Sequence, residues 1–355
     1  MPFLKIFNIF NKKFFLAIFI GTIGGAIFAS FNFPLAWMMG SMLTVTIFAL
    51  IGAKVEVDNK IRAIFISILG VMLGSAFTPN LIEQAGEFGI AFMIQLIYMI
   101  ISGLSAYIIY RSIPKYDKVT SYFSSTPGGL SEMTIVGEQY GGDSRIISLN
   151  HSVRILIIVT LIPFYFRIIE GVNVPLSVPQ SSFNLTIVDA AILVCCVIFG
   201  YPIASKLKIP AAALVGPMIL SAGVHITGIT NSLVPTIFIA TAQVFVGTSL
   251  GCRFTNRLEL RKMAKTILIA IIVAITMIVI AIIIILITKS FLPFSSKILF
   301  LSIAPGGLAE MSIIALALGT GTAFVTVMHF LRVSIVMLFG ALIYKIIFGN
   351  NSQKY

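Results

Sequence analysis

The feature that most constrains this chain is a series of long apolar segments. About 20 residues of α-helix cross the hydrocarbon core of a membrane, and each segment has about that length. Composition agrees, because 58% of the residues are hydrophobic and 10% are charged, against about a quarter charged in soluble domains. The sequence predicts an all-α polytopic membrane protein with about 10 transmembrane helices, at 14–33, 34–52, 61–78, 88–110, 145–169, 186–205, 209–228, 233–252, 266–288 and 320–348.

Two further segments, 119–141 and 297–318, carry the same helix-breaking phrase. It reads STPGGLSEM at 125–133 and APGGLAEM at 304–311. Proline lacks an amide hydrogen and glycine tolerates strained backbone angles, so each break leaves free backbone groups. Such groups are tolerated at membrane depth only when they are buried in protein or wetted. We expect a re-entrant or broken helix at each Pro-Gly-Gly.

The chain also contains a long internal repeat. Residues 24–52 align with 200–228, residues 70–78 align with 247–255, and the two Pro-Gly-Gly phrases align with each other. A period of this length is far too long for a solenoid, so it indicates two homologous membrane repeats, 1–178 and 179–355. The first apolar run looks like a cleavable secretory signal, but it has a counterpart in the second repeat and is expected to be retained.

Loop charges indicate the orientation of the repeats, because lysine and arginine in short loops favour the cytoplasmic side. With the N-terminus inside, the basic loops 53–62 and 111–118 lie inside, and 79–87, which has no lysine or arginine, lies outside. The basic loop 253–265 lies inside only if each repeat crosses an odd number of times. We therefore predict two inverted repeats of five full spans each. Both termini of this multi-pass protein are expected on the cytoplasmic side of a bacterial plasma (inner) membrane.

Inverted repeats with interrupted helices are a recurrent plan of secondary transporters, in which the substrate binds near the membrane midplane. Glu132 and Glu310 follow the breaks, in the first turn of a new helix whose positive end favours a carboxylate or an anionic ligand. Alternatively, each Pro-Gly-Gly is a tight surface turn and each glutamate only an N-terminal cap. The second copy of the pattern favours the functional interpretation, since ionisable residues inside membranes are functional candidates.

A second pair of sites combines histidine and arginine three residues apart, on one helix face. An arginine there can clamp a carboxylate, and a histidine can move a proton near neutral pH. The alternative is an internal Glu–Arg ion pair that holds the repeats together. The candidate substrate-binding residues are Pro127, Gly128, Gly129, Glu132, His151 and Arg154, with Pro305, Gly306, Gly307, Glu310, His329 and Arg332.

The doubled phrases PGGLSEM and PGGLAEM, with the preceding FPLAWMMGSM and IPAAALVGPM, resemble the AbrB family of bacterial membrane proteins. The resemblance covers nearly the whole chain. It implies a duplicated membrane domain with a fold similar to inverted-repeat sodium/proton antiporters and bile-acid symporters. Family members are often labelled regulators of gene expression or ammonia monooxygenases. Those antiporters often use paired aspartates, whereas this chain has glutamates beside Gly-Gly.

The residue pattern speaks against an enzyme and against direct DNA binding. His151, His225 and His329 are scattered, and the three cysteines form no C-x-x-C pair, so no metal or other cofactor is predicted. The net charge of +12 is spread over loops and suits the positive-inside rule and anionic lipid contact, not a nucleic-acid recognition module. His225 is expected at a helix end. An effect on transcription would therefore be indirect.

Three classes of function are weighed in order. The first is a secondary transporter of a small organic anion, with a proton or a sodium ion as the coupling ion. The second is a membrane sensor or indirect regulator without transport, and the third is a membrane monooxygenase. The expected partners are a small-molecule substrate and the lipid bilayer, with no direct nucleic acid. A homo-oligomer is compatible with the sequence.

Overall fold

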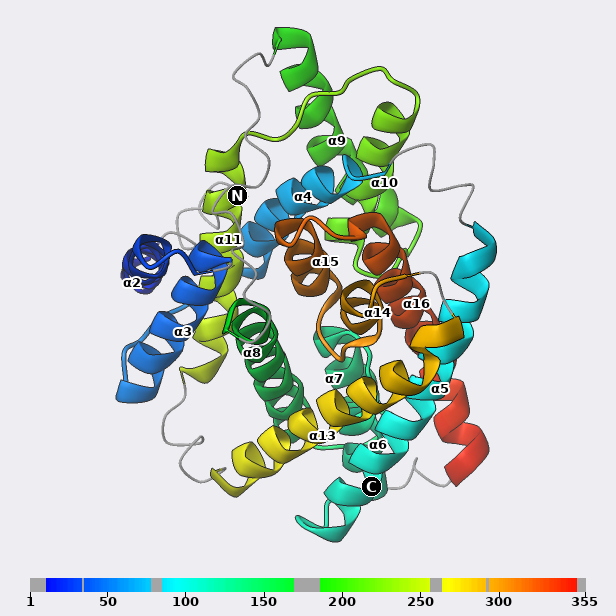
Figure 1. The fold of residues 1–355 in the computed structure, drawn as a ribbon. Coiled ribbons are helices and arrows are strands. Elements are labelled where there is room, and N and C mark those ends of the chain that lie inside the picture. The colour runs from blue at the N-terminus through cyan, green and yellow to red at the C-terminus, as the bar shows by residue number, and fades with distance from the viewer. Residues whose placement is uncertain are drawn as a thin grey trace. The chain divides into compact units, whose positions relative to one another are not determined.

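The fold is seen in a computed structural model that describes residues 11–33, 35–77, 85–168, 186–255, 264–291 and 294–349. Pro34, most of the loop 79–87 and residues 256–263 of the basic loop lie outside these ranges. The described residues form helices and contain no strand (Figure 1). A helix lies at each of the ten predicted spans: α2 (Lys12–Ser30), α3 (Ala36–Ile51), α4 (Asn59–Gly74), α5 (Ala85–Ser112), α8 (Ser144–Ile168), α9 (Ile187–Lys206), α10 (Ala212–Ile226), α11 (Thr236–Gly251), α13 (Ala264–Thr288) and α16 (Thr322–Phe348).

The remaining helices are short and flank the two breaks. They are α6 (Lys118–Ser125) and α7 (Leu130–Gln139) in the first repeat, and α14 (Ser296–Ile303) and α15 (Leu308–Ala317) in the second. Single 3₁₀ turns, η2 (Cys252–Phe254) and η3 (Lys289–Phe291), follow α11 and α13. Proline and glycine thus end helices where the sequence predicted an interruption.

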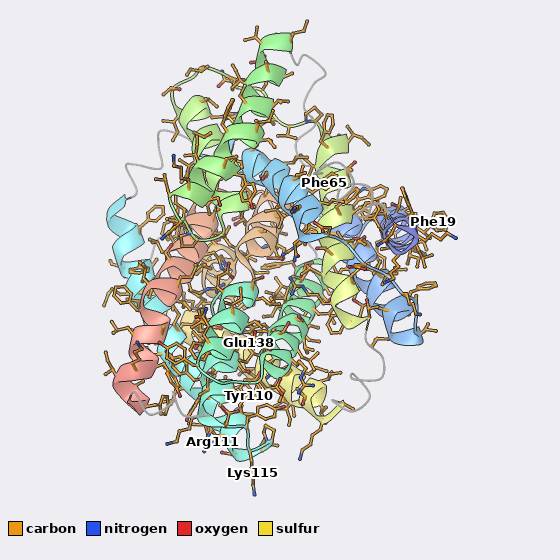
Figure 2. All side chains as sticks on the ribbon, turned by 180° about the vertical axis from the view of Figure 1, so that it is seen from behind. Phe19, Phe65, Tyr110, Arg111, Lys115 and Glu138 are labelled. Carbon is orange, nitrogen blue, oxygen red and sulfur yellow. The ribbon has the colours of Figure 1, made fainter. Side chains whose placement is uncertain are left out.

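Length and hydropathy make the fold that of a membrane protein. Seven helices of the described chain are long and apolar enough to cross a membrane, and α3 and α10 are apolar but shorter. Large apolar side chains are exposed along them; Phe19, on α2, is 65% exposed and points away from its helix (Figure 2). Because such surface is stable only in an apolar solvent or against a partner, the prediction of an all-α polytopic membrane protein is confirmed.

The chain divides by its internal contacts into two compact units. The first unit contains Met1–Pro79, Thr160–Arg261 and Leu316–Gly319, and the second contains Asn80–Val159, Lys262–Ala315 and Thr320–Tyr355. Each unit combines equivalent helices of both halves of the sequence. The first unit has α2–α4 with α9–α11, and the second has α5–α7 and most of α8 with α13, α14, most of α15 and α16. The repeats 1–178 and 179–355 describe a duplication in the sequence and stay a prediction.

In the first unit, glycines let equivalent helix pairs approach closely. On α2 and α3, a Cβ added to Gly24 would run into the carbonyl oxygen of Gly40, and one added to Gly40 would run into that of Gly24. On α9 and α10, a Cβ added to Gly216 would run into the carbonyl oxygen of Gly200, and one added to Gly200 would run into the backbone of Pro217. Helices in a lipid bilayer gain no hydrophobic stabilisation from packing together. Small residues at such crossings let the helix backbones approach closely, so that van der Waals contacts stabilise the pair.

A second set of glycines joins the repeats to each other within this unit. Gly70 and Gly74 on α4 lie against α10, where a Cβ on Gly70 would meet the carbonyl oxygen of Leu214. Their repeat equivalents, Gly247 and Gly251 on α11, lie against α3. The third helix of each repeat therefore packs against the second helix of the other repeat.

In the second unit, polar side chains join apolar helices. The hydroxyl of Tyr98 on α5 donates to the carbonyl of Met277 on α13 over 3.4 Å. The Tyr116 hydroxyl, beyond the end of α5, donates to Thr266 Oγ1 over 2.8 Å. Buried apolar residues from α5, α13, α14 and α16 pack together around Tyr98. This unit holds both Pro-Gly-Gly breaks.

Candidate functional site

The first Pro-Gly-Gly break is the tip of a helical hairpin. The helix α6 ends at Ser125, and Thr126, before the proline, has the extended backbone that a following proline imposes. Gly129 is the N-cap of α7. We call α6–α7 the first hairpin and residues 126–129 the first tip. At eight residues, α6 is about 12 Å long, well short of a hydrocarbon core about 30 Å thick.

Contacts at the base of the first hairpin show that the chain turns back. The amide of Asp143, just beyond α7, donates to Thr120 Oγ1 at the start of α6 over 2.9 Å. The rings of Phe123 and Tyr140 lie 5.7 Å apart between the two helices. Because the end of α7 returns to the start of α6, the first hairpin re-enters and does not cross.

The second break repeats this arrangement. We call α14–α15 the second hairpin and residues 304–307 the second tip. Ala304 has the extended backbone expected before proline, as Thr126 does. At the base, Gly321 lies against the side chain of Ile298, and these two positions are the repeat equivalents of Asp143 and Thr120. Both Pro-Gly-Gly elements are therefore re-entrant, and each repeat has five further helices besides its hairpin.

The motif residues that follow each break pack onto its glycines. A Cβ on Gly128 would lie 3.0 Å from the sulfur of Met133, and a Cβ on Gly306 would lie 2.7 Å from that of Met311. The second glycine of each tip is covered in the same way by a glutamate carboxylate, and the pairs are Gly129 with Glu132 and Gly307 with Glu310. In the shared pattern P-G-G-L-x-E-M, the glutamate and methionine side chains thus occupy the space that the two glycines leave free.

The two histidines hold the half-helices that lead into the tips. Nε2 of His151 on α8 lies 2.9 Å from the carbonyl oxygen of Phe123 on α6. Nε2 of His329 on α16 lies 2.7 Å from that of Leu301 on α14. A carbonyl only accepts, so each Nε2 carries the proton. Both residues are fully buried, and neither Nδ1 has a hydrogen-bond partner within the described ranges.

The two arginines differ although their positions are equivalent. Arg332, only 2% exposed, donates from Nη1 to the carbonyl of Ala304 over 2.7 Å and from Nη2 to the carbonyl of Gly306. Arg154, 6% exposed, has no hydrogen-bond partner in the described chain for Nε or Nη1. The second tip is therefore held by its arginine and the first tip is not.

Within the described ranges, no glutamate forms an ion pair with either arginine. Lys13 pairs with Glu56 and Arg145 pairs with Asp143, and neither of these ion pairs involves a residue of the two hairpins. The Glu–Arg ion pair that the sequence allowed is thus not formed here. Glu310 is 5% exposed and Glu132 is half-buried, each in the first turn of its helix, where the positive helix end stabilises a carboxylate.

The helix α16 brings the two tips into one site. Its Arg332 holds the second tip, and one turn later Val336 lies against Gly128 of the first tip. Arg154 and Arg332 are within electrostatic range of each other, and Tyr98 is within range of both. The predicted residues therefore gather in the second unit around two buried guanidinium groups.

Other polar residues of this region were not among the predicted site residues. Gln95 on α5 donates from Nε2 to the carbonyl of Ser302, next to the second tip, over 3.3 Å, and its Oε1 has no partner among the described residues. Asn150, beside His151, donates to Ser124 Oγ over 3.1 Å. The signal was available, since Gln95 is the one amide side chain in the apolar span 88–110. His225 lies in the last turn of α10, as predicted. The described ranges contain no group of three or more His, Cys, Asp or Glu that could hold a metal.

The model of the family described as "Transition state regulatory protein AbrB" matches residues 37–348. A protein of Bacillus subtilis (strain 168), named "Uncharacterized protein YhjN", is 24% identical, covering 98% of this chain and 96% of its own length. A protein of Escherichia coli (strain K12), named "Putative regulator AbrB", is 22% identical, covering 90% and 92%. The similarity thus extends over both repeats.

Proposed function

Because this chain belongs to the AbrB family, we propose that it is a secondary transporter of a small anionic metabolite that works by alternating access between its two repeats. The observation that carries the proposal is Arg154. Its guanidinium is buried and within electrostatic range of Arg332, and its Nε and Nη1 have no partner in the described chain. An anion would supply the missing charge and acceptors.

Charge favours an oxyanion over other ligands. An uncompensated charge inside a protein costs several kcal/mol, and two guanidiniums within range of each other add repulsion. The glutamates do not relieve it, because each carboxylate lies on its own tip glycine. Arginine donates several hydrogen bonds in one plane, which matches a carboxylate or a similar oxyanion. We therefore propose a small organic anion as substrate, with a proton or a sodium ion as coupling ion.

The hairpins favour transport over other uses of such a site. Two re-entrant elements, one from each repeat, meet at α16 in the second unit. Discontinuous helices of homologous repeats form the substrate sites of many secondary transporters. A bacterial plasma membrane location, with both termini cytoplasmic, belongs to the same proposal. The alternative is a sensor that binds the anion without moving it, and the word "regulator" in the name of the E. coli relative motivates it.

Ligand binding tests the proposal first. We would follow the thermal stability of the detergent-purified protein with small carboxylates, inorganic phosphate, amino acids and ammonium at constant ionic strength and two pH values. One anion class should stabilise the wild type. Arg154→Ala should weaken its binding by at least about 30-fold, because truncating a buried charged hydrogen-bond partner costs about 2–5 kcal/mol.

A matched control lies on the same helix. Arg145 is exposed and paired with Asp143, so Arg145→Ala removes one positive charge without touching the site, and it should leave ligand binding unchanged. Equal loss in both variants, or stabilisation by cations alone, would contradict an anion site at Arg154. Uptake of the identified anion into liposomes then separates the two functions, since binding without uptake would favour the sensor.

A further inference from the structure

The repeat relates each arginine to a pair of carbonyl groups. Arg332 donates to Ala304 and Gly306, which flank the proline of the second tip. The equivalent groups for Arg154 are the carbonyls of Thr126 and Gly128, 178 residues earlier in the chain. No hydrogen bond joins Arg154 to either of them in the described structure. The same residues thus occur in two arrangements within one molecule.

The two tips differ further in their own backbone and in exposure. In the first tip, the amide of Gly128 donates to the carbonyl of Thr126 over 2.8 Å, so this acceptor has a local partner in place of an arginine. Both residues are partly exposed. In the second tip, Ala304 and Gly306 are buried. The two acceptors of the second tip are thus buried and bonded to its arginine, whereas those of the first tip are partly exposed and lack that bond.

We propose that Arg154 and Arg332 exchange roles between the two states of the transport cycle. In the state described here, Arg332 locks the second tip and Arg154 binds the oxyanion. In the opposite state, Arg154 donates to the carbonyls of Thr126 and Gly128, and Arg332 is released to bind the ligand. The identity of the ligand rests on the proposed function, whereas the exchange of locks can be tested without any ligand.

Three physical reasons support the exchange. The tips share the pattern P-G-G-L-x-E-M, so the first tip has a pair of carbonyl groups equivalent to the pair that Arg332 binds in the second. The N–H groups that donate to the two tip carbonyls are the same ones that would donate to a carboxylate. The tip carbonyls and the ligand therefore compete for one guanidinium. In addition, the carbonyl ends of α6 and α14 carry partial negative charge, which stabilises whichever arginine is locked there.

Thiol labelling at equivalent positions beside the tips tests the exchange. Ser131 is exposed and its equivalent Ala309 is partly buried, so each reports on one tip. We would place Ser131→Cys or Ala309→Cys in a background in which the three native cysteines are replaced by serine, and measure maleimide labelling rates without ligand. With both arginines present, the cysteine at 131 should react faster than the one at 309.

Removing one lock should affect both tips in opposite directions. In Arg332→Ala, labelling at 309 should rise about tenfold and labelling at 131 should fall, because Arg154 now locks the first tip; tenfold corresponds to about 1.4 kcal/mol. Adding Arg154→Ala to this variant should restore fast labelling at 131. A rise at 309 with no fall at 131 would overturn the exchange and leave only local loosening.

A milder variant covers the case in which Arg332→Ala does not fold. Arg332→Lys keeps the charge but lacks the planar fork that reaches two carbonyls, so the same opposite changes should appear with smaller size. Unchanged rates at both positions in Arg332→Lys would also overturn the proposal. A ligand screen without a hit would count against the proposed function alone, since labelling uses no ligand.

Discussion

At the scale of single residues, the second glycine of each tip leaves space for the glutamate side chain three positions later in the sequence. A Cβ at Gly307 would occupy the place of the Glu310 carboxylate, and Gly129 stands in the same relation to Glu132. The carboxylate and the glycine therefore form one packing unit at the positive end of a short helix. This explains why the sequence repeats both residues together.

We expect Gly307→Ala to lower the free energy of unfolding by about 1–3 kcal/mol, the usual cost of forcing a group into filled space. Because the three atoms nearest to the added methyl all belong to the side chain of Glu310, Gly307→Ala combined with Glu310→Ala should recover most of the loss. Thermal unfolding in detergent measures both variants.

The control for this pair is Gly223→Ala on α10, where nothing lies within 4 Å of the added Cβ. Alanine is the better helix former by about 1 kcal/mol, so this variant should be neutral or slightly stabilised. A double variant as unstable as Gly307→Ala alone would show that backbone conformation, and not the carboxylate, requires the glycine.

The histidines show that the type of a residue does not by itself determine what the residue does in the structure. The sequence suggested a proton carrier, and the structure places Nε2 of His151 and of His329 on backbone carbonyls of α6 and α14. This contact anchors a half-helix whose last carbonyls lack partners within the helix. Proton transfer through the buried Nδ1 atoms stays a prediction.

At the scale of helices, the first unit depends on glycines facing backbone. A Cβ at Gly70 would meet the carbonyl oxygen of Leu214, and a Cβ at Gly247 would meet that of Met38. A main-chain oxygen cannot rotate away as a side chain can. The two contacts are equivalent under the repeat, so they should contribute similarly to stability.

We expect Gly70→Ala and Gly247→Ala each to lower the free energy of unfolding by about 1–3 kcal/mol, since overpacking outweighs the gain of about 1 kcal/mol in helix propensity. Thermal unfolding of the purified variants measures this. Gly103→Ala on α5, whose nearest neighbour is the carbonyl oxygen of Ser125 at 4.0 Å, should cost nothing. Loss at only one of the two sites would contradict their equivalence.

At the scale of the whole molecule, re-entrant hairpins determine which loops share a side of the membrane. Since α7 returns to the start of α6, positions 115 and 139 must face the same side, and so must positions 296 and 320 around the second hairpin. Arg111 and Lys115 extend from the end of α5 (Figure 2), and such basic loops favour the cytoplasm.

We therefore expect single cysteines at 115 and 139 to be protected from an impermeant thiol reagent in intact cells, and cysteines at 296 and 320 to be labelled. Permeabilised cells provide the control, because all four should then react. Opposite results within one pair would contradict re-entrance. Agreement within each pair, with the two pairs on one common side, would contradict the predicted inversion of the repeats.

The sequence by itself determined the membrane class, the positions of ten helices and the two interruptions. These are local properties, since a run of apolar residues has a length and a proline has no amide hydrogen wherever it is placed. It also identified Arg154 and Arg332 as a pair, because the repeat is visible as spacing. Membership of the AbrB family followed from the doubled motif.

Only the tertiary structure decided that the interruptions re-enter, since that depends on Asp143 meeting Thr120 across the hairpin. It also decided that Arg332 bonds to the Ala304 and Gly306 carbonyls instead of a glutamate, while Arg154 does not do the same. Packing of the helices likewise brings Gln95 to the carbonyl of Ser302, next to the second tip. Which partner a buried charge takes is set by what the packed helices bring within about 3 Å, and no spacing along the chain encodes that distance.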